Sequence, residues 1–290
     1  MEITQSDRVE QEILKKLNLI EWKAQINFEA YGTRVGIRSN CVKTIENFKV
    51  ILPEILPAGW NDLGKTAPDY LFSIVREDNH SKKDALYKND EVILEEFSIE
   101  ESWAFIKSQI RITVAEFSEE YVFLHAGVVG WKGRAVIMPG KSFAGKTTLV
   151  SEFVKRGADY YSDDLTVIDK NGYVHPFPKK LSIRGILENN EQVDFEVEEL
   201  GGSRGLDPIP VGALILTEYK KHKKPEFSRC SVGHGIMKSI ENSLSVRQSP
   251  KFVINVLNKI TKDAIILESS RREAKEFVDF FLKLLDDSCL

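Results

Sequence analysis

The chain has 290 residues and a formal net charge of -4 at neutral pH, and 42% of its residues are hydrophobic and 29% charged. This composition is typical of a folded globular protein and excludes wholesale disorder, while the acidic balance argues against a nucleic-acid-binding protein. The length is sufficient for two domains of ordinary size.

The sequence lacks the features of export or membrane insertion. Its first residues have no basic segment followed by an apolar one, and no run of about 18 apolar residues occurs. The three cysteines (Cys41, Cys230 and Cys289) are widely separated and lack the spacing of zinc ligands, so reduced structural thiols are the simplest interpretation. We therefore expect a cytoplasmic protein without nucleic-acid or membrane partners.

The first 118 residues predict a mixture of helices and strands. The elements expected here are, in chain order, a helix around Val9–Leu17, a strand at 31–37, a helix capped by Asn40 that ends near Pro53, and strands at 71–75 and 91–95, the second after a turn at 88–90. Ser98 and Glu101 then form a capping-box pattern. Apolar residues follow it at steps of three and four, namely Trp103, Ile106, Ile110, Val114 and Phe117. This helix is expected to close a smaller α+β N-terminal domain, residues 1–118.

From residue 119 onward, strands and helices alternate. Residues 121–129 and 134–138 are nearly continuous apolar runs, as expected for strands buried on both faces of a sheet. The further elements expected are a helix from about Lys146 to Arg156 ended by Gly157, a strand leading to Ser162, core strands at 213–217 and 264–267, and a last helix with Ala274, Phe277, Val278, Phe281 and Leu285 on one face. This alternation predicts an α/β domain over residues 119–290.

Within this domain, the acidic and glycine-rich segment 189–205 is expected to be mobile and to order over the site, with Arg204 approaching the phosphate. An ordinary surface loop is the alternative.

A phosphate-binding loop joins the second of these strands to the first helix of the domain. The sequence Gly140-Lys141-Ser142-Phe143-Ala144-Gly145-Lys146-Thr147 fits the Walker A pattern at every required position, and Thr148 follows. The glycines let backbone N–H groups face phosphate oxygens, Lys146 supplies charge to the β- and γ-phosphates, and the Thr147 hydroxyl is a ligand for magnesium. The helix directs its positive end at the same anion. The sequence therefore predicts a site for ATP with Mg²⁺.

Asp163 and Asp164 follow the next apolar strand, which places them where ligands bind in α/β sheets. One carboxylate could accept the proton of an attacking hydroxyl while the other supports the metal; a solvated loop or a helix cap is the alternative. His125 lies inside an apolar strand, so it is either a core residue or a partner of one of the aspartates.

Residues 124–185 resemble the catalytic domain of HPr kinase/phosphorylase, and most closely the HPr-kinase-like proteins of lasso-peptide biosynthesis, which phosphorylate a peptide serine. The resemblance is carried by His125-Ala-Gly127, by the phosphate loop, by Ser162-Asp-Asp164 and by the stretch 176–185 with its Ile-Arg-Gly ending. It implies a P-loop HPr-kinase-like C-terminal domain. It also implies that Asp163 is the catalytic base, that Asp164 supports the metal and His125, and that Arg184 contacts phosphate or acceptor.

The chain departs from the family pattern at two positions. Ser182 stands where these kinases usually carry a glutamate, and Thr148 replaces a glutamate after the loop. The resemblance is therefore used for phosphoryl transfer alone, and neither the phosphorylase reaction nor HPr as acceptor is inferred from it. We expect an ATP-dependent kinase acting on a serine of a peptide or protein, such as a lasso precursor, and possible homo-oligomers. A small-molecule kinase, a hydrolase and a nucleotide-dependent binding protein remain alternatives.

Overall fold

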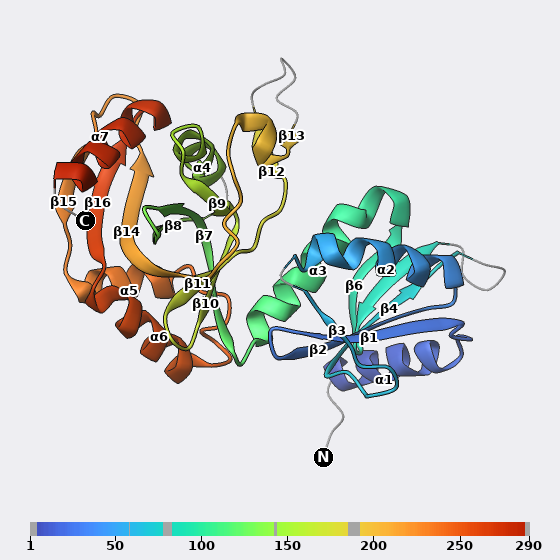
Figure 1. Ribbon diagram of the computed structural model, residues 1–290. Coiled ribbons are helices and arrows are strands. Elements are labelled where there is room, and N and C mark those ends of the chain that lie inside the picture. The colour runs from blue at the N-terminus through green and yellow to red at the C-terminus, as the bar shows by residue number, and fades with distance from the viewer. Residues whose placement is uncertain (1–4, 58, 78–82, 142–143, 185–191, 288–290) are drawn as a thin grey trace. The chain divides into compact units, whose positions relative to one another are not determined.

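The computed structural model describes residues 5–57, 59–77, 83–141, 144–184 and 192–287 (Figure 1). The chain divides into two compact units, residues 1–114 and 115–290. The division falls inside helix α3 (Ile99–Phe117), a few residues before the boundary expected at 118. No helix in the described part of the chain is both long enough and apolar enough to span a membrane.

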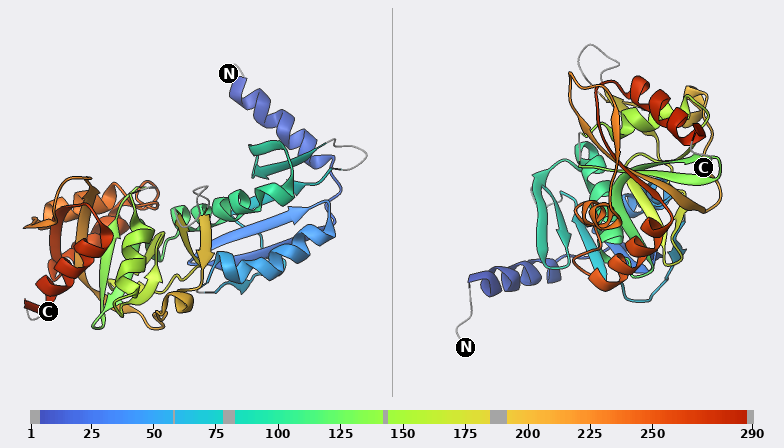
Figure 2. Two further views of the ribbon diagram at one scale, coloured as in Figure 1. Left: turned by 90° about the horizontal axis from the view of Figure 1, so that it is seen from above. Right: turned by 90° about the vertical axis from the view of Figure 1, so that its left-hand side faces the viewer.

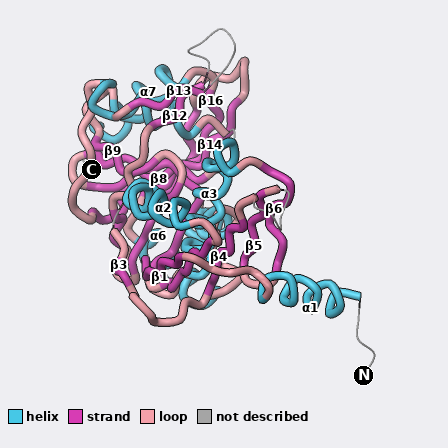
Figure 3. The backbone as a smooth tube through the Cα atoms, turned by 90° about the vertical axis from the view of Figure 1, so that its right-hand side faces the viewer, coloured by secondary structure: helices cyan, strands magenta, loops and turns pink. Residues whose placement is uncertain are grey.

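The first unit is a six-stranded sheet with three helices. Its elements are α1 (Gln5–Asn18), β1 (Ala24–Ala30), β2 (Thr33–Ser39), α2 (Val42–Ile55), β3 (Asn61–Asp62), β4 (Tyr70–Val75), β5 (Asp84–Lys88), β6 (Glu91–Phe97) and α3. The strand order is β3-β1-β2-β4-β5-β6, in which only β2 and β4 run parallel among the described pairs. Helices α2 and α3 lie side by side over one face (Figures 1 and 2). The carboxyl-terminal part of α1 packs at the β5–β6 edge, from which the helix projects (Figure 3).

The first unit differs from the sequence-based expectation at the first hairpin and at both ends of α2. Tyr31 and Gly32 both have positive φ and form a two-residue hairpin turn, so β2 begins at Thr33 and β1 precedes it as an additional strand. Asn40 does not cap α2. Its side chain instead bonds both the N–H and the carbonyl oxygen of Arg76, at 2.8 and 3.0 Å, and so joins the end of β2 to the end of β4. The helix also continues past Pro53 to Ile55.

The second unit is built on an eight-stranded mixed sheet. Its elements are β7 (Tyr121–Trp131), β8 (Arg134–Pro139), α4 (Lys146–Val154), β9 (Asp159–Ser162), β10 (Leu165–Asp169), β11 (Tyr173–His175), β12 (Leu181–Arg184), β13 (Gln192–Phe195), the 3-10 helix η1 (Val197–Leu200), β14 (Ile209–Tyr219), β15 (Glu226–Arg229), α5 (Val232–Ile240), α6 (Pro250–Lys262), β16 (Ile265–Arg271) and α7 (Ala274–Asp287). The strand order is β11-β10-β7-β8-β14-β16-β15, with β9 also paired to β7, and β12 and β13 form a separate hairpin. The expected α/β class is therefore confirmed for this unit, although β7 and β8 are antiparallel and only β8, β14 and β16 form a parallel core.

The apolar runs of the central strands are buried on both faces, as expected. Val136 and Met138 of β8 face a core made with α4 and α7, while Ala135 and Ile137 face a second core made with α6. The alternation follows from the two-residue repeat of a strand, and a helix pair covers each face of the sheet (Figure 1). The sheet is thus the middle layer of three, and the carboxyl end of β8 is held in place from both sides.

The segment expected to be mobile contains regular structure where it is described, although residues 189–191 lie outside the described part. Residues 192–195 pair with β12, and η1 follows with a capping box between Glu196 and Glu199. Arg204 forms ion pairs with Glu196 and Glu198. The structure therefore gives Arg204 carboxylate partners within its own segment.

Candidate phosphate-binding site

The phosphate loop begins at the carboxyl end of β8 and ends where α4 begins. Gly145 is the N-cap of α4 and has φ of 76°, a left-handed conformation that favours glycine. A Cβ atom at this position would also collide with the guanidinium of Arg271, which comes from the end of β16. Arg271 Nη2 donates to the carbonyl oxygens of Ala144 at 2.7 Å and of Gly145 at 3.4 Å. A cation from β16, two strands away from β8 in the sheet, therefore holds the backbone at the end of the loop.

Lys146 is buried at the first position of α4 and turns back over the loop. Its ammonium donates to the carbonyl oxygens of Gly140 at 2.8 Å and Lys141 at 3.1 Å, and it lies 3.0 Å from Nε2 of His125. Burial lowers the pKa of Lys146, the charges of Asp164 and Asp163 partly oppose this effect, and Lys179 adds to the lowering. A bound phosphate would favour the charged ammonium and offset its burial.

The pairing along β7 brings the acidic pair to the loop. Strands β9 and β10 both pair with β7, one after the other along its length. Asp163 and Asp164 connect these two strands, so they lie beside the middle of β7 and not at the outer end of a strand. The N–H of Ala126 donates to the carbonyl oxygen of Asp164 at 3.1 Å across this break. Ala126 pairs on its other side with Pro139, the last residue of β8. The register therefore sets His125, the acidic pair and the start of the loop side by side.

Asp163 is bound to the residue expected to hold magnesium. Its side chain is buried, with Oδ2 accepting a hydrogen bond of 2.6 Å from the Thr147 hydroxyl. Its Oδ1 lies 3.1 Å from the Tyr160 hydroxyl, which also lies 2.9 Å from the carbonyl oxygen of Lys179. Burial first, and then the charge of Asp163, raise the pKa of Tyr160 well above its usual value, so this hydroxyl stays protonated and can donate.

Asp164 is more accessible and faces the cations of the site. Its side chain is 33% exposed, and its Oδ2 accepts a hydrogen bond of 3.0 Å from Lys179. Its Oδ1 lies 3.4 Å from Nε2 of His125, the same nitrogen that contacts Lys146. His125 therefore stands between the loop lysine and this carboxylate.

A cavity of about 670 Å³ lies on the other side of the loop. Residues of the loop form one wall, and the carboxyl ends of β14 and β16 with the end of α5 form the others. Lining residues include Gly140, Lys141, Thr217, Lys238, Glu268 and Ser270. Because β8 lies between β7 and β14, the loop separates this cavity from the acidic pair.

Four of the expected site residues are not part of the cluster as described. Thr148 is exposed. Ser142, Phe143 and the side chain of Arg184 lie outside the described part of the structure.

Three residues of the cluster, Tyr160, Lys179 and Arg271, carry no sequence-based assignment. Lys179 belongs to the stretch that carries the family resemblance, which was the one signal available for it. Arg271 has no local signal, because its partners on the loop are 126 and 127 residues away in the sequence.

The donors at the loop fit magnesium. Thr147 Oγ1 and Asp163 Oδ2 are hard oxygen donors in contact with each other, and Asp164 supplies a further carboxylate nearby. Mg²⁺ is usually held by one or two carboxylates together with water and substrate phosphates. Thr147 and Asp163 would therefore hold the ion, which would neutralise charge on the nucleotide.

Comparison with known proteins assigns no activity to this site. No protein-family model matches the chain, and no curated protein is similar to it. Among solved structures, the chain is similar to the Hpr(Ser) kinase/phosphatase from Coxiella burnetii, with 14% sequence identity, coverage of 56% of this chain and 97% of that chain, and a TM-score of 0.28. At that identity and TM-score the likeness supports no conclusion about activity.

Proposed function

We propose that the chain is an ATP- and magnesium-dependent kinase that transfers the γ-phosphoryl group to a hydroxyl, with a serine of a peptide or protein as the acceptor. The observation that supports phosphoryl transfer is the division of labour in the acidic pair. Asp163 is engaged by Thr147, whereas Asp164 is accessible and adjoins His125 and Lys179. An accessible carboxylate beside the loop is what a general base for an incoming hydroxyl requires. The serine acceptor rests on the family resemblance.

The contacts favour exchanging the two roles that the resemblance implies. The oxygens of both aspartates have partners, so burial is what distinguishes the two residues. The Asp163 side chain is buried against the Thr147 and Tyr160 hydroxyls, whereas that of Asp164 is 33% exposed. Asp163 is suited to orient Thr147 and hold magnesium. Asp164 has an exposed edge from which it can accept the proton of an incoming hydroxyl, since a general base must come within hydrogen-bond reach of that proton. Lys146 and Lys179 would neutralise charge on the transferred group, and His125 would orient Asp164.

The cavity on the far side of the loop is suited to the nucleoside. The acidic pair has to meet the γ-phosphate and the acceptor, so the rest of the nucleotide has to extend away from it. The loop residues Gly140, Lys141 and Ala144 line the cavity, which places it next to the expected phosphate position. A volume of about 670 Å³ lies in the range usual for small-molecule sites, roughly 300–1,000 Å³.

The test is an ADP-release assay with Mg-ATP and matched acceptors. The acceptors are a lasso precursor peptide with a C-terminal serine, the same peptide with that serine replaced by alanine, and small hydroxyl compounds such as glycerol. Turnover with the serine peptide alone supports the proposal, and the phosphorylated serine should appear by mass spectrometry. Turnover without any acceptor would indicate a hydrolase, and turnover with glycerol alone a small-molecule kinase. If thermal stabilisation by Mg-ATP occurs with no turnover under any condition, the chain is a binding protein. The Lys146→Ala variant is the control and should lose both stabilisation and turnover.

A further inference from the structure

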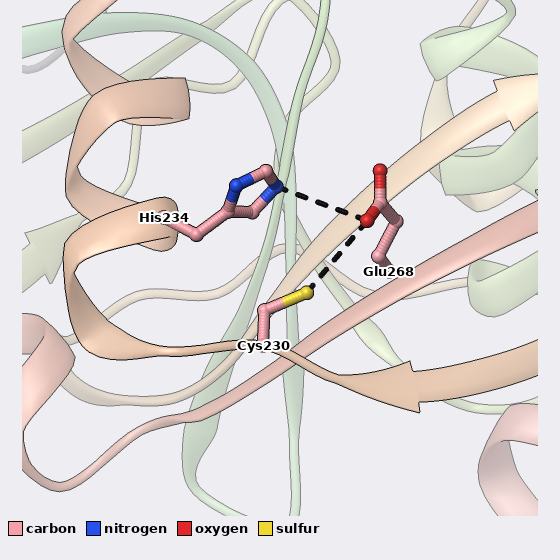
Figure 4. Close-up of side chains that lie close together, drawn as sticks. All are labelled: Cys230, His234 and Glu268. Atoms are coloured by element: carbon pink, nitrogen blue, oxygen red, sulfur yellow. Dashed lines mark hydrogen bonds and ion pairs between the residues drawn. The ribbon is translucent and has the colours of Figure 1, made fainter.

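Three side chains with metal-binding atoms converge outside the phosphate site. Cys230 follows β15, His234 lies in the first turn of α5, and Glu268 belongs to β16. Figure 4 shows the thiol and the imidazole both directed at the Glu268 carboxylate. Cys230 Sγ and His234 Nε2 each lie 3.8 Å from Glu268 Oε2, and one donor atom from each residue lies within 4.8 Å of the other two.

The backbone holds these side chains in place. Ser228 pairs with Glu268 in the β15–β16 ladder, and the N–H of Cys230 donates to the carbonyl oxygen of Ile266 at 2.9 Å, so the pairing extends to the cysteine. Residues 228 and 230 lie on the same face of β15, which sets the thiol diagonally across from Glu268. The Ser231 hydroxyl caps α5 by accepting from the N–H of His234 at 3.2 Å.

The donor atoms of this cluster are poorly satisfied by the protein itself. Among the described residues, the buried Nε2 of His234 has no hydrogen-bond partner. The thiol of Cys230 reaches Glu268 and the Ser228 carbonyl oxygen only at 3.8 and 3.9 Å, distances typical of weak sulfur contacts. A cation would satisfy all three groups at once.

We propose that Cys230, His234 and Glu268 form a three-ligand site for a divalent cation of the zinc class. Thiolate and imidazole ligands select zinc over magnesium and calcium, which prefer oxygen donors alone. Zinc bond lengths of about 2.0–2.3 Å in a tetrahedral site imply ligand separations of roughly 3.4–3.6 Å, close to the two separations of 3.8 Å. The spacing of the cysteines alone does not reveal this set, because Glu268 lies 38 residues from Cys230.

The fourth coordination position would face the cavity beside the phosphate loop. Glu268 and Ser228 line that cavity, and the Glu268 side chain is 57% exposed. A tetrahedral zinc with three protein ligands keeps one position for water or for a ligand group. The site therefore belongs to the zinc sites that can bind an exchangeable ligand, in contrast to the closed four-ligand structural sites.

The test is a titration of the full chain with Co²⁺ under reducing conditions, followed by displacement with Zn²⁺. One equivalent of cobalt should give the strong visible bands of tetrahedral coordination and a thiolate-to-cobalt charge-transfer band, and zinc should abolish both. The charge-transfer band should disappear in Cys230→Ser and persist in Cys41→Ser, the matched control in the other unit. Absence of the band in the parent, or its persistence in Cys230→Ser, would overturn the proposal.

Glu268→Gln keeps the test decisive if Cys230→Ser fails to fold. The residue is exposed, so the fold should be retained by circular dichroism. Zinc affinity, measured by competition with a chromophoric chelator, should fall by about tenfold or more. Loss of a group that only supports a metal ligand already lowers affinity by about tenfold to a hundredfold. An unchanged affinity would remove Glu268 from the site. Neither measurement depends on phosphoryl transfer, so the outcome is independent of the proposed kinase activity.

Discussion

The two neighbouring aspartates differ in what their oxygens already contact. Asp163 is buried against Thr147 and Tyr160, and Asp164 is partly exposed beside His125. The Lys179 ammonium approaches both carboxylates, at 3.0 Å from Asp164 Oδ2 and 3.9 Å from Asp163 Oδ1. We expect Asp164→Asn to retain Mg-ATP binding and to lose phosphoryl transfer by about a hundredfold to ten-thousandfold, the usual contribution of a general base. We expect Asp163→Asn to weaken the magnesium dependence of nucleotide binding as well as turnover. Calorimetry with ATP at several magnesium concentrations, together with kcat, separates the two variants.

The matched control for this pair is Asp169→Asn. Asp169 lies on β10 and bonds His175 at 3.0 Å, away from the loop. Its variant should bind ATP and turn over like the parent. If Asp163→Asn binds Mg-ATP normally and only its turnover is lost, then Asp163 is the base, as the family resemblance implies.

Lys146 makes nucleotide binding sensitive to alkaline pH. Burial lowers the pKa of Lys146 from 10.5, and a bound phosphate would raise it again. Above the lowered pKa of the free protein, nucleotide binding therefore takes up a proton. Affinity for ATP should therefore fall as pH rises through the range below 10.5. Calorimetry in two buffers of different ionisation enthalpy reports this proton uptake directly.

The neighbouring charge provides the control for this pH dependence. Lys179 lowers the pKa of Lys146, so Lys179→Met should move the loss of affinity to higher pH. Affinity that stays constant up to pH 10.5 in the parent would show that Lys146 remains fully charged without nucleotide.

At the scale of elements, β16 positions the phosphate loop through one side chain. Arg271 donates to the Ala144 and Gly145 carbonyl oxygens from a buried position, and hydrogen bonds to charged groups contribute about 1.5–3 kcal/mol. If this energy holds the loop ready for phosphate, Arg271→Ala should weaken ATP binding by roughly 10- to 100-fold. Binding of ATP to the variant, measured by calorimetry, checks this.

Arg272→Ala is the matched control. This neighbouring arginine pairs with Glu276 in the first turn of α7, at 3.1 Å. Among the described residues, it makes no hydrogen bond to the loop. The control should bind ATP like the parent. An equal loss of affinity in both variants would indicate a general effect on this end of β16 and not an anchor for the loop.

Periodicity predicted the elements that position the site, and could not predict the contacts between them. Strands β7, β8, β14 and β16 were predicted because their apolar runs fill two cores. Among the described elements, no sequence signal was used for the strands β1, β3, β5, β10–β13 and β15, the 3-10 helix η1 and the helices α5 and α6. Helix α6 was missed although it carries Pro250 at its start and four buried apolar residues at helical spacing, Val253, Val256, Leu257 and Ile260.

The cluster at the loop shows where sequence reasoning stops. The Walker A pattern is local, so it predicted the loop, Lys146 and Thr147 directly. The partnership of Asp163 with Thr147 depends on two strands sharing β7, and that of Arg271 with the loop depends on parallel pairing of β8, β14 and β16. These partnerships arise from strand pairing over long sequence separations, which no periodicity records.

At the scale of the whole molecule, each of the two units has a core of its own. The clusters around β1–β6 are made from residues 13–114, and the clusters around β7–β16 from residues 122–285. All described residues assigned here to the phosphate site belong to the second unit. A unit with a complete core is expected to fold without its neighbour.

We therefore expect a fragment of residues 118–290 to fold cooperatively and to bind Mg-ATP with the affinity of the full chain. The fragment begins at Ser118 because the Ser118 hydroxyl is buried and accepts from the N–H of Tyr121 at 3.1 Å, which fixes the start of β7. Removal of the preceding helix leaves both cores of the second unit intact. Thermal unfolding with and without Mg-ATP checks both expectations, and Lys146→Ala in the same fragment controls for nonspecific stabilisation. A folded fragment that does not bind ATP would mean that the first unit contributes to the nucleotide site, and an unfolded one would mean that the second core depends on the first.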